Sequence, residues 1–138
     1  MAVGFKVNFF WFPVGTGDFL HSFFSTISYH LESEGWGTRY PYLINQVYNG
    51  KLGSYDVANV RAELMEIRER LTEYSSSQVI WDIEDLSKQP PWGTNISKEI
   101  TSLSNYFVTN DGKDLFDVFL EALNCASKYD FDLEIHIV

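Results

Sequence analysis

The chain has 138 residues, of which 45% are hydrophobic and 17% aromatic, and its 19 acidic and 10 basic residues give a net charge of -9. This composition predicts one packed globular domain over residues 1–138 and excludes an intrinsically disordered chain. The negative charge argues against nucleic acid or an anionic membrane as a partner and favours a basic protein, although acidity can also serve solubility alone.

The cellular location of the protein is predicted from three absences in the sequence: an export signal, a membrane-spanning stretch and a set of paired cysteines. The opening MAVGFKVNFFWFPVG contains one lysine and a short apolar run but no small-residue cleavage site, so no export signal is expected. No apolar stretch of the sequence is long enough to span a bilayer. The single cysteine, Cys125, excludes an internal disulfide framework and a thiolate metal cage. These features together predict a cytoplasmic protein.

The first half of the chain alternates between expected strands and helices. Residues 4–12, GFKVNFFWF, are rich in β-branched and aromatic residues and predict one buried strand. Asp18 is expected to cap a helix whose large apolar residues recur at helical spacing until Gly35. A glycine-rich segment follows, in which Pro41 is expected to open a short helix that ends near residue 49.

The second half contains the clearest helical pattern. Residues 56–73 carry apolar side chains at alternating three- and four-residue steps, which predicts an amphipathic helix packed inside the domain. QVIWDIE, residues 78–84, alternates as a strand should. A short helix capped by Asn95 and a brief strand over 105–109 are expected next.

The C-terminal part predicts the remaining secondary structure. Apolar residues from Leu115 to Leu123 indicate a last helix, and FDLEIHIV, residues 131–138, alternates as a final strand. Strands that alternate with helices in so short a chain predict an α/β or α+β fold. We expect a small sheet of roughly three to five strands covered by helices, with a strand order that the sequence does not reveal.

Common catalytic motifs do not occur in the sequence. No serine lies in a G-x-S-x-G elbow, and the three histidines lack the spacing of a zinc-binding H-E-x-x-H pair. GTGD, residues 15–18, lies between an expected strand and helix but lacks the lysine and hydroxyl residue of a phosphate-binding P-loop. The sequence therefore predicts no cofactor.

WDIEDLSKQPPWG, residues 81–93, concentrates three carboxylates, two tryptophans and two prolines. On a strand, Asp82 and Glu84 would lie about 6.6 Å apart on one face, which would suit a divalent metal or an acid–base pair. Alternatively the two acids are a solvated strand face and Asp85 is a turn or cap residue. A third interpretation is a docking edge in which the acids meet a basic partner and Trp92 anchors the contact.

Two further groups of residues are candidates for partner binding. Trp36 and Tyr40 lie in the glycine- and proline-rich segment and could serve as aromatic anchors. Asp111, Asp114, Asp117 and Glu121 form a second acidic zone that follows one face of the last helix. Part of this zone is expected to be structural, because acids at a helix N-terminus cap it and complement its dipole.

Four segments resemble the immunity protein 70 family of bacterial polymorphic toxin systems: GDFLHSFFSTISYHLE, GWGTRYP, WDIEDLSKQPPWG and NYFVTNDGKDLF. The resemblance covers about residues 3–125, and the run that ends in PPWG is its most specific part. It implies a cytoplasmic protein, without enzymatic activity, that binds and inhibits a toxin used in contact-dependent competition between bacteria. It supplies no catalytic residue.

The resemblance and the net charge together predict a cofactor-free protein that neutralises a cognate toxin domain, such as a basic nuclease, as a monomer or a dimer. Two alternatives remain open at this point: a metal-dependent hydrolase that uses Asp82 and Glu84, and a housekeeping protein-interaction domain. The residues expected to bind the partner are Asp82, Glu84, Asp85, Trp92, Trp36, Tyr40, Asp111, Asp114 and Asp117.

Overall fold

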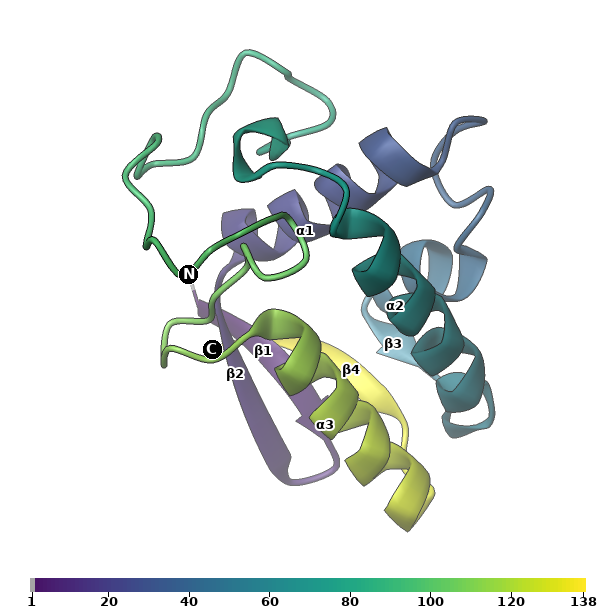
Figure 1. Cartoon of the computed structure of the whole chain (residues 1–138). Coiled ribbons are helices and arrows are strands. Elements are labelled where there is room, and N and C mark those ends of the chain that lie inside the picture. The colour runs from purple at the N-terminus through teal and green to yellow at the C-terminus, as the bar shows by residue number, and fades with distance from the viewer. Residues whose placement is uncertain (1) are drawn as a thin grey trace.

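Four strands form one antiparallel sheet in the computed structural model, which describes residues 2–138 (Figure 1). The strand order is β2-β1-β4-β3. Helices cover one face of this sheet, which confirms the predicted α+β fold. The strands are β1 (Ala2–Val7), β2 (Phe10–Thr16), β3 (Lys51–Leu52) and β4 (Leu133–Ile137), and the α-helices are α1 (Gly17–Leu31), α2 (Val57–Leu71) and α3 (Leu115–Tyr129).

The N-terminal hairpin corrects the expectation of one strand over residues 4–12. β1 ends at Val7, which pairs with Phe10 across a two-residue turn. Asn8 occupies the left-handed backbone region with φ 54°, which asparagine tolerates better than other side chains. Asn8, a polar residue inside an apolar run, therefore lies where the chain reverses direction.

Helix α1 begins two residues earlier than the sequence suggested. Its N-cap is Thr16, whose extended backbone lets the side-chain hydroxyl accept the N–H of Phe19 at 3.1 Å. Asp18 lies in the first helical turn and is not the cap, so that expectation was wrong. At the other end the helix stops at Leu31, ahead of Gly35.

The hydrophobic core lies between the sheet and helices α1 and α3. Phe5 of β1 contacts Phe119 of α3, with ring centroids 4.3 Å apart, and both side chains are fully buried. Phe23 of α1 packs between α3 and the segment before it, against Phe107 and Phe116. Helix α2 packs against α3 and the short π-helix η1 (Tyr42–Val47), so the expected helix after Pro41 is present in π form.

The segment between α2 and α3 differs most from expectation. From residue 72 to residue 114 the chain forms no α-helix and no extended strand, only the 3-10 turn Ser76–Gln78 and an isolated bridge between Val108 and Asp114. The predicted strand over 78–84, the short helix after Asn95 and the strand over 105–109 are therefore wrong. In Figure 1 this segment is the long teal-to-green loop that passes beside α1 and returns to α3.

Candidate functional site

The segment that was predicted to be a strand pairs with side chains of helix α1. The carbonyl of Ile80 accepts the hydroxyls of Ser22 at 2.8 Å and Thr26 at 3.1 Å. The N–H of Ile80 donates to the same Thr26 hydroxyl at 3.0 Å, and the N–H of Ile83 donates to Ser25 Oγ at 3.2 Å. These hydroxyls take the place of a neighbouring strand, since they satisfy backbone groups that would otherwise be buried without partners.

Replacing Thr26 with valine should lower the free energy of unfolding by about 1–3 kcal/mol, because the N–H of the half-buried Ile80 loses its acceptor, the hydroxyl of the fully buried Thr26. The Thr26→Ser variant keeps the hydroxyl and is the matched control, with a smaller loss. Urea denaturation of both variants measures the difference. Equal stability of the valine variant and the wild type would contradict the role of this hydroxyl.

Two carboxylates hold the backbone of the loop that follows α1. Glu32 is 4% exposed, and its two oxygens accept the N–H groups of Gly37 at 2.9 Å, Arg39 at 3.1 Å and Tyr40 at 2.9 Å. Glu63 of α2 accepts the N–H of Leu43 at 2.7 Å, and burial raises the pKa of its carboxyl above the ordinary value. The loop base is thereby fixed, while its tip projects outward with Trp36, which is 37% exposed.

The loop tip and the 79–85 segment meet over α1 and enclose a surface hollow of about 320 Å³. We call it the Trp36 hollow. The Trp36 ring meets the Tyr48 ring edge-on, with centroids 4.8 Å apart. Two of the predicted partner-binding residues, Trp36 and Glu84, are thus brought together. The residues that line the hollow are His21, Trp36, Tyr48, Ile83 and Glu84.

A polar chain runs along one side of the Trp36 hollow. His21 Nε2 lies 3.2 Å from Asp82 Oδ1, and the Tyr48 hydroxyl lies 3.1 Å from His21 Nδ1. A neutral imidazole therefore donates from Nε2 to the carboxylate and accepts the tyrosine proton at Nδ1. The pKa of Asp82 is lowered first by the N–H of Glu84 and then by His21, with a smaller contribution from Lys88 at 3.5 Å. Asp82 is therefore an ionised but already paired carboxylate.

The three acids of the 81–93 stretch play different parts. Asp85 accepts the N–H and the hydroxyl of Ser87, which lowers its pKa and makes it a turn residue. Asp82 is bound to its neighbours, as described above. Glu84 is exposed, and its carboxylate makes no hydrogen bond or ion pair with any residue from 2 to 138. Burial raises the pKa of Tyr48, and the nearby charges of Glu84 and Asp82 raise it further.

The other predicted aromatic anchors are placed differently. Tyr40 is 2% exposed, and burial raises its pKa to about 12, so the expectation that it is a surface anchor was wrong. Trp92 is 38% exposed, and its indole N–H donates to the Tyr106 hydroxyl at 2.8 Å. Its ring also stands edge-on to Trp81, with centroids 5.4 Å apart, so much of Trp92 serves to close the long loop.

The geometry does not favour the metal-site interpretation of Asp82 and Glu84. They do not share a strand face, and the Lys88 ammonium already lies beside Asp82. Across residues 2–138, no three histidine, cysteine, aspartate or glutamate side chains are grouped closely enough to hold a metal ion. In the same range no helix combines the length and the apolar character needed to cross a membrane.

A family model described as immunity protein 70 matches residues 5–135. The chain belongs to this family. The match confirms the resemblance inferred from the sequence and extends it through α3 into β4. No curated protein matches the chain, and no solved structure matches it.

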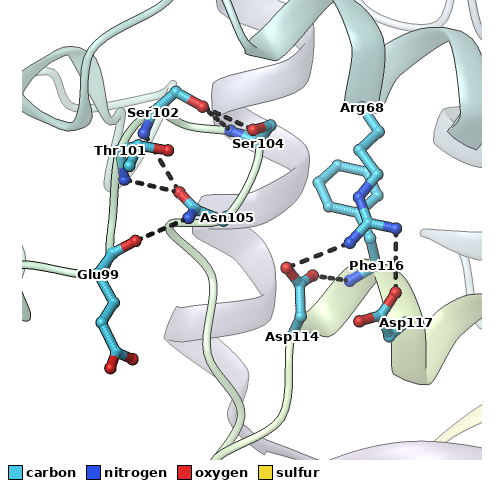
Figure 2. Close-up of polar contacts among 9 residues, drawn as sticks. All are labelled: Arg68, Glu99, Thr101, Ser102, Ser104, Asn105, Asp114, Phe116 and Asp117. Atoms are coloured by element: carbon cyan, nitrogen blue, oxygen red, sulfur yellow. Dashed lines mark hydrogen bonds and ion pairs between the residues drawn. The ribbon is translucent and has the colours of Figure 1, made fainter.

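In this member of the immunity protein 70 family, the second acidic zone is largely engaged within the fold (Figure 2). Asp114 caps α3 by accepting the N–H of Phe116 at 2.8 Å. Arg68 of α2 reaches across to Asp114 at 3.4 Å and Asp117 at 3.0 Å, and its guanidinium lies over the Phe116 ring. Asp111 accepts the Thr109 hydroxyl in the preceding turn. Asp114 and Asp117 therefore join α3 to α2, and Arg68 partly offsets their charges.

Sequence reasoning missed the residues that build the Trp36 hollow around its predicted members. The sequence pattern around His21 and Tyr48 does not indicate that these two residues line a shared hollow. The hydroxyl side chains of α1 that bind Ile80 and Ile83 can be recognised in the sequence, since Ser22, Ser25 and Thr26 recur at helical spacing among large apolar residues. A polar stripe inside an otherwise apolar helix face indicates a buried backbone partner, and this signal could have been used.

Proposed function

We propose that this chain binds a cognate toxin domain in the cytoplasm of the cell that makes both proteins and thereby blocks the toxin. The observation that carries the proposal is membership of the immunity protein 70 family over residues 5–135. The proposed mechanism is inhibition by contact and needs no catalytic group or cofactor.

The charge of the protein supports a basic toxin domain, such as a nuclease, as the partner. A net charge of -9 accelerates the encounter with a basic protein by long-range attraction, and salt screens this attraction. The Trp36 hollow supports the same proposal, because it offers half-exposed aromatic surface beside an unpaired carboxylate. Interfaces gain most of their affinity from such central aromatic groups.

Calorimetric titration with the C-terminal domain of the toxin encoded beside this protein tests the proposal. We expect one-to-one binding that weakens by at least about tenfold between roughly 50 mM and 500 mM NaCl, because salt screens the attraction between opposite charges. Co-expression should also restore growth of cells that produce the toxin. A toxin domain that remains fully active at micromolar excess of this protein would refute the proposed function.

A further inference from the structure

The Trp36 hollow combines two features that together define the chemistry of an occupant. Its walls include the indole of Trp36 and the phenol ring of Tyr48, which meet edge-on and present aromatic surface. At its rim stands Glu84, exposed and without an ion-pair partner among residues 2–138. Aromatic faces attract cations through the ring quadrupole, and a carboxylate attracts them directly.

The charges around the Trp36 hollow restrict the occupant further. Asp82 accepts a hydrogen bond from His21, and the Lys88 ammonium offsets its charge, whereas the charge of Glu84 has no such partner among residues 2–138. An anionic occupant would be repelled by Glu84. A purely apolar occupant would strip water from this carboxylate without replacing it, which is unfavourable. A planar cation is attracted by the Glu84 carboxylate, and its N–H groups replace the water that this carboxylate loses.

We propose that the Trp36 hollow binds the guanidinium of an arginine presented by the toxin. The guanidinium stacks on the face of one of the two rings, which stand at 79° to each other, and its N–H groups donate to the Glu84 carboxylate. Arginine fits better than lysine, because its planar group stacks on aromatic rings and forms two parallel hydrogen bonds with a carboxylate. This inference rests on the proposed function and adds the chemistry by which the partner is recognised.

The hollow can be tested without the toxin by NMR titration with N-acetyl-L-arginine methylamide. The neutral N-acetyl-L-citrulline methylamide, which has nearly the same shape, serves as the control. We expect a saturable shift of the Trp36 indole N–H with the arginine probe, little shift with the citrulline probe, and a loss of affinity of about fivefold or more in Glu84→Gln. The Trp36→Phe variant assigns the signal. Equal shifts with both probes, or no saturable shift, would overturn the inference.

Titration with the toxin domain then tests the hollow in the complex. Glu84→Gln should weaken binding by about tenfold or more, as expected for a charged pair near the centre of an interface. Glu69→Gln removes the same charge from an exposed position on α2 outside the hollow and should weaken binding by less than about twofold. Thermal unfolding confirms that both variants fold.

The outcomes separate the two proposals. Equal losses in the two variants would overturn the arginine site while the proposed function stands. Failure of the wild-type protein to bind the toxin domain would overturn the proposed function, and the arginine-probe titration would then decide the chemistry of the hollow alone.

Discussion

Replacing Glu32 with alanine is expected to lower the free energy of unfolding by about 3 kcal/mol or more, because three backbone N–H groups lose their acceptor at once. The N–H groups of Gly37 and Tyr40 are bound within buried surroundings, so water does not readily replace the carboxylate. The Glu32→Gln variant keeps one acceptor oxygen and should fall between alanine and the wild type. Urea denaturation followed by circular dichroism measures all three proteins.

The matched control for Glu32 lies two residues further along. Glu34 is exposed, and its substitution by alanine should change the free energy of unfolding by less than about 0.5 kcal/mol. The Glu32→Ala variant should also loosen the loop that carries Trp36, visible as a larger exposure of this tryptophan to a fluorescence quencher. Stability of Glu32→Ala within the error of Glu34→Ala would show that the loop base is held in another way.

Replacing Phe23 with alanine should produce the largest loss, about 3–5 kcal/mol, because it removes a fully buried ring from the centre of the core. This ring stands edge-on to Phe107 and Phe116, with centroids 5.3 Å and 5.1 Å away, and so connects α1 to α3 and to the segment before it. The cavity that remains cannot close without moving both elements. Chemical denaturation reports the free energy of unfolding, and calorimetry the melting temperature.

The control for Phe23 is a phenylalanine that faces water. Phe9 lies in the hairpin turn and is 78% exposed, so its replacement by alanine should change stability by less than about 0.5 kcal/mol. The two variants delete the same atoms from the same chain and differ only in burial. Similar losses for both would mean that α1 is not packed as described.

The elements that could be predicted from the sequence are those whose pattern is local. The apolar residues of α2 and α3 recur at helical spacing. Both helices begin within two residues of the position that this spacing predicts. Alternation in the last residues correctly indicated β4. The same alternation over 78–84 was misleading, because the backbone of this segment bonds to hydroxyl groups of α1 and not to a strand. Residues 79–83 are all half-buried, so the alternation in the sequence has no counterpart in burial.

The candidate site was only partly predictable, since its members meet through long-range contacts. Trp36 and Glu84 could be selected individually, one as a loop aromatic and the other as a free acid. Both residues meet Tyr48 in the hollow through contacts between distant parts of the chain. The Tyr48 hydroxyl bonds to His21, 27 residues away in the sequence, and His21 bonds to Asp82, which is 61 residues away. No local pattern reports such contacts. The ion pairs of Arg68 with Asp114 and Asp117 at the N-terminus of α3 could not be predicted for the same reason.

The carboxylate of Glu32 separates the part of the loop that holds the fold from the part that faces outward. Its bonds reach backbone atoms from Gly37 onward, and backbone atoms are present whatever the side chain. Substitutions of Ser33, Glu34 or Trp36 remove none of these hydrogen bonds, whereas Gly35 has φ 117°, a conformation that strains other residues. Under the proposed function, the side chains of residues 33, 34 and 36 can therefore change, and with them the surface offered to a toxin, while Glu32 keeps the base of the loop in place.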